Sequence, residues 1–390
     1  MSTLKVDNIR HNNATSDAIT MVSDGTCTAK LTSVGGGQLS HRNLIINGAM
    51  NVAQRGVSST SLYYQTIDRF RTSFGYIGSI NVTQSQQQLT SSDTPYSSGF
   101  RYFHRTALSG AGTVNANGYI GISQRLEAQD VAQSGWNYTS ASSYITIQFW
   151  FRCSTNQTFY MALTSQDGTS QSYPFAFTAS GNNAWTKITK TIPGNSNLQF
   201  DLNTDRGLTV SFTPWYGTDW TGTKTLDAWT PFVGSAEYPD YASTWLTAGA
   251  STFDITGVQL EVGDTATTFE HRSYGEELQL CKRYYRKFVS GNNYGRFGIG
   301  YAPGSSTVRL PIRLDPEMRI AAANANFSTG GSFSLQPGTW GSPTVTCEDV
   351  SSSKDVLLIK IDSTTVTTGH AVSVHGNNDD DAYFAISAEL

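Results

Sequence analysis

The stretch YITIQFWFR, residues 144–152, decides the fold class, because a large apolar side chain occupies every second position from Ile145 to Phe151. In an extended strand successive side chains point to opposite faces, so Ile145, Ile147, Phe149 and Phe151 share one face. A helix would spread these four side chains around its circumference. The stretch therefore predicts a strand with one face on a core and the other face turned outward.

Shorter segments on both sides of this strand repeat the pattern. Residues 175–177 and 208–212 alternate in the same way, and turn residues occur at 167–168, 181–183 and 193–194. Many short strands separated by regular turns are typical of a sandwich or a jelly roll. We therefore predict that residues 44–272 form a jelly-roll β-sandwich domain.

The composition agrees with an all-β protein. Only 14% of the 390 residues are charged, and the chain holds 36 Gly, 19 Tyr and 19 Phe. Aromatic and β-branched side chains suit a pleated, half-buried surface, and glycine suits tight turns. The length allows two or three domains of about 100–200 residues each.

Charge and hydropathy exclude two classes of partner. The net charge is −4 and no basic block is present, so a nucleic-acid partner is not expected. No run approaches about 18 apolar residues, so no membrane insertion is expected. The first ten residues lack the apolar core of a secretory signal, so we expect the chain to leave its cell within a particle or by lysis.

Residues 1–43 differ from the rest of the chain. They are polar, contain only short apolar segments and end near a glycine hinge at 35–37. Such a segment cannot bury a core by itself, so it is either disordered or ordered against another protein. In the second case residues 1–43 are an attachment or stem segment that binds another subunit or another protein.

Residues 273–288 predict a connecting helix. Ser273 and Glu276 have the spacing of a capping box, and basic residues follow toward the helix end. Four side chains fall along one helical stripe, which we expect to pack against symmetry mates in a homotrimer. They are Leu278, Cys281, Tyr285 and Phe288.

Residues 289–390 return to strand patterns and predict a smaller β-sandwich, the β-rich tip domain. Residues 308–314 alternate cleanly, and Pro311 within them suggests an edge strand because it lacks an N–H. Residues 356–361 and 382–386 predict two further strands. The acidic turn at 377–381 is expected to be solvated, with a calcium site as the alternative.

No pattern in the sequence predicts catalysis. The six histidines and four cysteines have no metal-binding spacing, and catalytic or nucleotide-binding motifs are absent, so we expect no enzyme, no cofactor and no metal. The alternative is a glycan hydrolase, which needs two carboxylates about 5–9.5 Å apart. The candidate carboxylates lie in predicted turns: Asp201, Asp205, Asp219, Glu237 and Asp240.

Aromatic side chains offer candidates for sugar binding. Sugars stack their CH faces on aromatic rings, but such rings fill a core more often than they bind ligands. The crowded segment of the central domain contributes Trp215, Trp220, Trp229, Tyr238 and Tyr241. The tip domain contributes Tyr294, Tyr301 and Trp340 as candidate contacts.

Three stretches, in order and spacing, resemble phage and prophage tail-fibre proteins. They are NLIINGAMNVAQR at 43–55 with IDRF at 67–70, YIGISQRLE at 119–127, and ITGVQLEVG at 255–263 continuing to residue 285. The opening MSTLKVDNI is also similar to the start of structural proteins in phages of marine bacteria. Residues 289–390 carry no such motif.

The resemblance implies a jelly roll similar to carbohydrate-binding modules, then a helix and a variable tip, in a homotrimer. It implies a virion protein, a tail fibre or receptor-binding subunit, that attaches to host-surface glycan. Two alternatives stay open: an architectural head-decoration or neck-fibre protein that binds only virion proteins, and a glycan-cleaving tailspike. Location in the particle and release of reducing ends would distinguish them.

Overall fold

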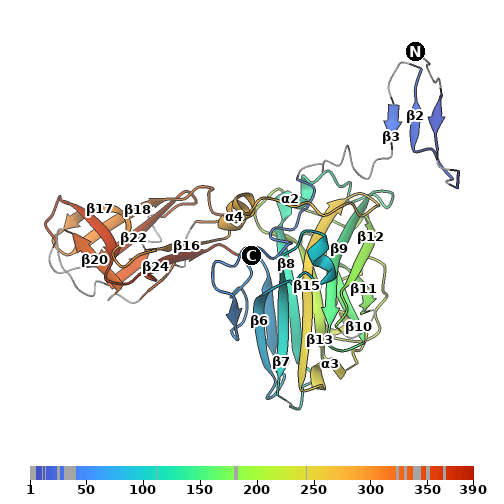
Figure 1. Cartoon of the computed structure of the whole chain (residues 1–390), viewed down its shortest axis with the longest axis horizontal. Coiled ribbons are helices and arrows are strands. Elements are labelled where there is room, and N and C mark those ends of the chain that lie inside the picture. Colours follow the sequence, from blue (N-terminus) through green and yellow to red (C-terminus); the bar gives the residue numbers. More distant parts are fainter. Residues whose placement is uncertain are drawn as a thin grey trace.

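The computed structural model describes residues 6–10, 12–13, 15–23, 27–29, 41–110, 112–179, 183–242, 244–321, 325–328, 332–336, 344–347, 352–362 and 366–390. For residues 28–29 and 344–347 only the backbone is described. Within these ranges the protein is all-β, with a small N-terminal sheet, a large central domain and a smaller tip domain (Figure 1).

The central domain is a jelly-roll-type sandwich of two six-stranded antiparallel sheets. In spatial order, sheet 1 contains β14 (Thr230–Pro231), β11 (Gln171–Thr178), β10 (Thr158–Ser165), β13 (Arg206–Tyr216), β8 (Tyr119–Glu127) and β5 (Arg71–Gly75). Sheet 2 contains β12 (Thr186–Pro193), β9 (Tyr144–Cys153), β15 (Ala250–Val262), β7 (Tyr102–Ser109), β6 (Asn81–Gln88) and β4 (Ser58–Ser59).

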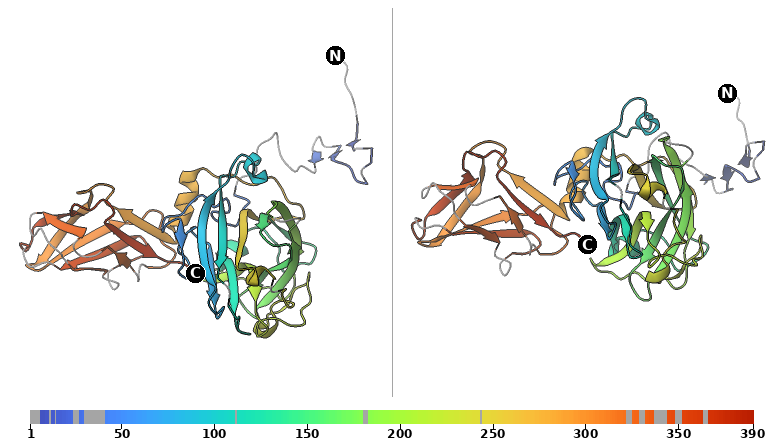
Figure 2. Two further views of the ribbon diagram at one scale, coloured as in Figure 1. Left: turned by 60° about the horizontal axis from the view of Figure 1, so that its bottom comes forward. Right: turned by 90° about the horizontal axis from the view of Figure 1, so that it is seen from below.

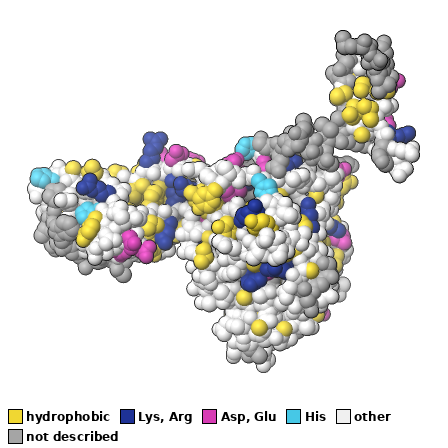
Figure 3. Space-filling model, in the orientation of Figure 1, with side chains coloured by type: hydrophobic (Ala, Val, Ile, Leu, Met, Phe, Trp, Pro, Cys, Tyr) yellow, Lys and Arg dark blue, Asp and Glu magenta, His cyan; other side chains and the backbone are white. Residues whose placement is uncertain are grey.

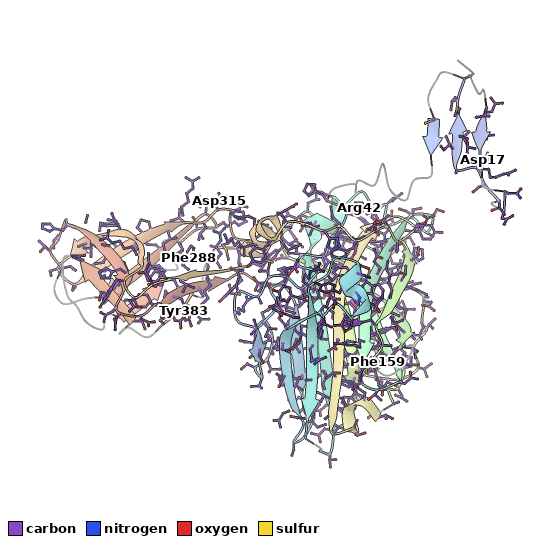
Figure 4. The ribbon with its side chains drawn as sticks, viewed as in Figure 1. Asp17, Arg42, Phe159, Phe288, Asp315 and Tyr383 are labelled. Carbon is purple, nitrogen blue, oxygen red and sulfur yellow. The ribbon has the colours of Figure 1, made fainter. Side chains whose placement is uncertain are left out.

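The core lies between these two sheets, and the alternation in β9 sets its composition. Ile145, Ile147, Phe149 and Phe151 are fully buried, as predicted. Phe151 packs edge-to-face on Phe177 with ring centroids 5.0 Å apart, and such aromatic pairs supply much of a core's burial. Figure 4 labels Phe159, which belongs to the same cluster.

Helices in the described residues are short and lie at the ends of strands. They are α1 (Thr94–Ser97), α2 (Ala128–Ala132), the 3-10 turn η1 (Gly234–Ala236), α3 (Thr244–Thr247) and α4 (Tyr274–Lys282). No helix among the described residues is long and apolar enough to cross a bilayer.

The first motif fixes the entry into the central domain. Asn43 donates from Nδ2 to the carbonyl of Val258, and its Oδ1 accepts from the backbone N–H of Leu260 and of Ile45. Gln124 makes two hydrogen bonds of 2.8 Å with the backbone of Ile46. Buried amide side chains therefore hold the entry segment against both sheets, and the central domain begins before residue 44.

The connecting helix is shorter than its pattern predicts. Ser273 caps it by accepting from the N–H of Glu276, as expected, but α4 ends at Lys282. Tyr285 and Phe288 instead belong to the strand β16 (Tyr285–Val289), where they point to opposite faces. Cys281 is fully buried within the chain itself. The stripe is thus not continuous along a helix, and the homotrimer stays a prediction.

The tip domain is a smaller sandwich, and its strands also alternate in burial. Sheet 3 contains β16, β24 (Tyr383–Ser387) and β19 (Ala325–Phe327). Sheet 4 contains β20 (Phe333–Gln336), β23 (Ala371–Gly376), β17 (Arg296–Gly304), β18 (Thr307–Arg313), β22 (Val356–Asp362) and β21 (Thr344–Cys347).

One prediction for the tip domain is wrong. β18 lies between β17 and β22, so Pro311 is not on an edge strand. Its strand pairs with β22 along its whole length, whereas its register with β17 involves only Thr307 and Arg309. The missing N–H of the proline is tolerated because the pairing with β17 stops before it.

The two domains meet at a joint of buried charges. Arg283 makes two hydrogen bonds, of 2.7 and 2.8 Å, to the carboxylate of Glu127, which also accepts from the hydroxyl of Tyr284. Arg69 pairs with Glu389 and stacks on the Tyr284 ring. In Figures 1 and 2 the tip domain projects from one side of the central domain, and residue 390 lies at the joint.

The N-terminal segment forms a three-stranded antiparallel sheet of β1 (Asn8–Ile9), β2 (Ile19–Met21) and β3 (Cys27–Ala29). None of its described residues is buried, and Ile9 and Met21 are close to half exposed. The glycine hinge at 35–37 lies outside the described residues. A role as an attachment segment stays a prediction.

Candidate functional site

The outer face of sheet 2 carries the candidate site, because strand register lines up its outward side chains. Trp150 on β9 lies opposite Lys187 on β12 and Thr256 on β15. Two residues along β9, Gln148 lies opposite Gln259. These positions alternate with the core residues of β9, so they point away from the core. In Figure 1 the strands of this sheet lie side by side across the front of the central domain.

A cavity of about 460 Å³ opens on this face. Trp150, Phe100 and Phe269 give it aromatic walls, and Gln148 and Lys187 give it polar ones. Trp150 is half-buried, so part of its ring is open to a ligand. The lining combines aromatic and polar side chains in similar numbers, so the cavity can contact both apolar and polar groups of a ligand.

The amide of Gln148 supplies the specific chemistry of the cavity. Gln148 is 1% exposed; its Nε2 donates to the carbonyl of Thr267, and its Oε1 is buried without a hydrogen-bond partner. Leaving a buried acceptor unpaired costs about 1–3 kcal/mol. Among the described residues no carboxylate pairs with Lys187. The cavity therefore offers an acceptor for a ligand hydroxyl and a donor for a ligand oxygen.

A network of ion pairs borders the cavity along the same face. Arg152 links Asp93 to Asp254 at 2.8 and 2.9 Å, and Arg105 pairs with Asp254 at 2.8 Å. Burial alone would raise the pKa of Asp93, but hydrogen bonds, including one from the Trp185 N–H, and the Arg152 charge hold it below its ordinary value. These charged groups neutralise one another, so the network of ion pairs holds Trp185 in position and makes the outer face of sheet 2 more rigid.

Figure 3 has the orientation of Figure 1 and shows the side of the molecule that sheet 2 faces. Lys and Arg side chains gather near the middle of the central domain, on a surface made mostly of uncharged polar side chains. Such a surface suits a ligand rich in hydroxyl groups.

The aromatic residues predicted from the sequence lie elsewhere. Tyr238 and Trp215 are only 2% and 4% exposed. The polar atoms of the other three are already bound within the chain: Trp229 donates to Pro193, Trp220 to Asn117 and Tyr241 to Thr213. The five rings thus form no common open face, because they pack the loop after β13 onto sheet 1.

Three of these rings, Trp220, Trp229 and Tyr241, are half-buried and keep some access to solvent. Trp215 and Tyr241 line a smaller cavity of about 250 Å³ together with Asp240. Sugar binding by these rings stays a prediction.

The tip candidates are exposed where they are described. Tyr294 and Tyr301 are 53% and 48% exposed, and Trp340 lies outside the described residues. Ile299 is 70% exposed and lies two residues before Tyr301 on β17, so both point outward on one face of sheet 4. A contact role for this face stays a prediction.

The carboxylates considered for hydrolysis lie in the loops on the two sides of β13, and the charges of Asp201 and Asp205 both act on the carboxyl of Asp167. Burial raises the pKa of Glu237 to about 7, and Lys224 opposes that shift. Asp240 accepts from the hydroxyl of Thr221 at 2.6 Å. Asp201 lies in another turn, where its N–H donates to Asp167. These contacts do not test enzymatic activity, so the absence of catalysis stays a prediction.

Cysteines and acidic groups provide no metal centre among the described residues. Cys27, Cys153 and Cys281 are free thiols, and burial raises the pKa of Cys153 to about 12. In the acidic turn, the N–H of Asp381 donates to Asp379, which makes a local turn contact.

Sequence reasoning missed Trp150, Gln148 and Lys187, although the sequence holds a signal for two of them. The alternation that buries Ile147 and Phe149 also assigns Gln148 and Trp150 to the outer face. A tryptophan at an outward strand position is unusual unless something covers it. Lys187 could not be found this way, because its position opposite Trp150 depends on strand pairing.

No family model matches the chain, and no curated protein matches it either. Solved structures that resemble it include the enzymatically active domain of tailspike protein 4 of bacteriophage CBA120, the family 11 carbohydrate-binding module of a Clostridium thermocellum cellulosomal cellulase, and the N-terminal cellulose-binding domain of Cellulomonas fimi β-1,4-glucanase C.

These three structures align over 57%, 55% and 55% of this chain at 10%, 11% and 9% identity, with TM-scores of 0.29, 0.26 and 0.26. The alignments cover 21% of the tailspike chain and 98% and 99% of the two binding modules. Because every TM-score is below 0.5, these resemblances carry no weight for function.

Proposed function

We propose that the chain is a structural protein of a bacteriophage virion, a tail-fibre or receptor-binding subunit that attaches to host-surface glycan through the outer face of sheet 2. The observation that carries the glycan part is a cavity lined both by the half-buried Trp150 and by Gln148, whose Oε1 has no hydrogen-bond partner. The motif resemblance to tail-fibre proteins supports the virion part.

The chemistry of the cavity matches a sugar. The CH face of a pyranose ring can stack on Trp150, and a hydroxyl can donate to Gln148 Oε1 while another accepts from the Lys187 ammonium. A single site of this kind binds weakly, and several copies in one particle convert weak sites into firm attachment.

The test compares Trp150 on sheet 2 with Trp220 in the loop that follows β13 of sheet 1. The full chain is screened on a glycan array, and the best ligand is then titrated by calorimetry. We expect Trp150→Ala to weaken binding at least about tenfold, since an aromatic platform contributes on the order of 1.4 kcal/mol. Trp220→Ala, on the side predicted from the sequence alone, should bind like the wild type.

The outcomes separate the alternatives. Loss of binding in Trp220→Ala but not in Trp150→Ala would move the site to sheet 1. No binding to any host glycan by the wild type would favour the architectural alternative. Thermal unfolding of each variant checks that the fold is intact.

The virion role, the homotrimer and attachment through residues 1–43 belong to the same proposal. A particle reconstruction should show the chain on an external fibre, in three copies per fibre, with the N-terminal sheet against another virion protein. A head or neck location would contradict the receptor-binding role. Release of reducing ends from host polysaccharide would contradict the proposal that the chain is not an enzyme.

A further inference from the structure

The joint between the central and tip domains encloses a second cavity, of about 360 Å³. It shares no lining residue with the cavity on sheet 2. Four tyrosines and two cations from both domains define its character: Tyr63, Tyr64, Tyr285, Tyr383, Arg55 and Lys287.

Strand register explains how the tip domain presents its share. Tyr285 and Lys287 alternate with Phe288 along β16, and they lie opposite Ser387 and Ala385 on β24. Phe288 packs on the tip core, so Tyr285 and Lys287 point to the other face of sheet 3, toward the joint. Figure 4 labels Phe288 and Tyr383 on the tip domain.

The central domain supplies the opposite wall. Tyr63 is 45% exposed, and Arg55 is largely buried with its guanidinium 3.6 Å from the centre of the Tyr285 ring. Arg55 pairs with Glu389 at 3.2 Å and with Asp68 at 3.7 Å. This buried guanidinium is therefore already neutralised, and it supports the Tyr285 ring at the wall of the cavity.

Lys287 supplies the positive charge of the cavity, because Asp68 and Glu389 neutralise Arg55. No carboxylate is among its lining residues. The Lys287 ammonium lies 4.6 Å from the centre of the Tyr383 ring, and among the described residues no carboxylate forms an ion pair with it. A cation held over an aromatic ring, with open aromatic surface beside it, suits a ligand that combines an anionic group with an apolar face.

We infer that this joint is a second binding site, for an acidic sugar whose ring stacks on the tyrosines and whose carboxylate or phosphate pairs with Lys287. The site is independent of the cavity on sheet 2 and goes beyond the proposed function. Because both domains contribute to it, a bound sugar would also hold the tip domain in its orientation.

Binding to the full chain is measured by ligand-detected NMR and calorimetry with four probes. Trigalacturonate and neutral galactotriose test the need for an anion, and glucuronate and glucose 6-phosphate distinguish a carboxylate from a phosphate. We expect acidic probes to bind at least about tenfold more tightly than galactotriose, with an affinity that falls as salt rises. Equal binding of acidic and neutral probes, or none by any acidic probe, would overturn the inference.

Substitutions at the joint and on sheet 2 show which of the two cavities binds the acidic probe. Lys287→Gln should weaken the acidic probe about tenfold, and Lys287→Arg should retain most of the affinity. Tyr63→Ala, at an exposed position that leaves the fold intact, should also weaken it. Trp150→Ala should leave it unchanged, so failure at sheet 2 and failure at the joint are distinguishable. Unchanged affinity in both Lys287→Gln and Tyr63→Ala would refute the site.

Discussion

At the scale of single residues, buried polar side chains define this molecule more sharply than its apolar core does. Any large apolar residue of suitable shape could serve in many core positions, whereas Asn43 and Gln124 each complete specific backbone hydrogen bonds. Both residues belong to the motifs quoted from the sequence, at 43–55 and 119–127. Their role in the fold explains why the motifs are polar although they lie in a buried region.

His104 on β7 makes stability depend on pH. It is fully buried, and this burial lowers its pKa to about 4, so the folded protein holds it neutral. The unfolded chain binds the proton more tightly, so stability is complete above about pH 6.5 and is lost as the pH falls toward 4.

Urea unfolding at pH 7 and pH 5 measures this effect. The wild type should lose about 2 kcal/mol more than His104→Gln between these two values. The glutamine does not titrate and can keep the hydrogen bond to Thr72. An equal loss in both proteins would mean that His104 is not the titrating group.

At the scale of elements, alternation in the sequence predicted the strands well because one face of each strand is buried. The strands at 144–152, 208–212 and 308–314 all carry this pattern. The end of the connecting helix could not be predicted from spacing. Cys281 is buried in α4 and Tyr285 is buried in β16. A short helix followed by a strand therefore buries the same sequence positions that one longer helix would bury.

The candidate site could be predicted from the sequence only in part, because strand pairing brings its lining residues together. Crowding of aromatic rings along the chain predicted a ligand site near Trp215, but those rings cover their own sheet. The cavity on sheet 2 instead combines β9, β12 and the segment around Thr267, which come together only through strand pairing.

The bulge in β15 is an element-scale feature with a clear test. Gly257 has φ +62°, and the register with β9 shifts between Thr256 and Gln259, as its position in a strand pattern predicts. A Cβ at this position would lie 2.7 Å from the Phe100 ring. Gly257→Ala should therefore destabilise the fold by about 2–3 kcal/mol in urea unfolding, from backbone strain and from the clash.

Gly249 provides a matched control for that substitution. It also has a positive φ, of +82°, but a Cβ there would have no neighbour within 4 Å. Gly249→Ala should cost only about 1 kcal/mol, the backbone part alone. Equal costs for the two variants would show that the contact with Phe100 contributes nothing.

At the scale of the whole molecule, the joint depends on partners that are far apart in the sequence. Arg283 pairs with Glu127, and Arg69 pairs with Glu389, across separations of 156 and 320 residues. No local pattern signals such pairs, so the sequence predicted two sandwiches but not how they join.

The joint should make the two domains unfold together. Arg283→Met leaves the buried Glu127 carboxylate without its cation, at a cost of about 3 kcal/mol. In calorimetry we expect one transition for the wild type and two for this variant. Glu317→Gln, which removes the exposed partner of Arg283, should change little. A single, unshifted transition in Arg283→Met would contradict the coupling.

The tip domain is fastened by two adjacent strands, and this has a mechanical consequence. The peptide chain passes from the joint into the tip domain through β16, and β24 returns beside β16 to the joint. Just after β24, Glu389 pairs with Arg69, and the N–H of Ala388 donates to the carbonyl of Tyr284. A force that pulls on the tip domain is shared between the peptide chain at β16 and the ion pair of Arg69 with Glu389. A torque is resisted as well, since a body held at two neighbouring points cannot swivel about one. Drag on an anchored tip would thus reach the central domain as a directed load.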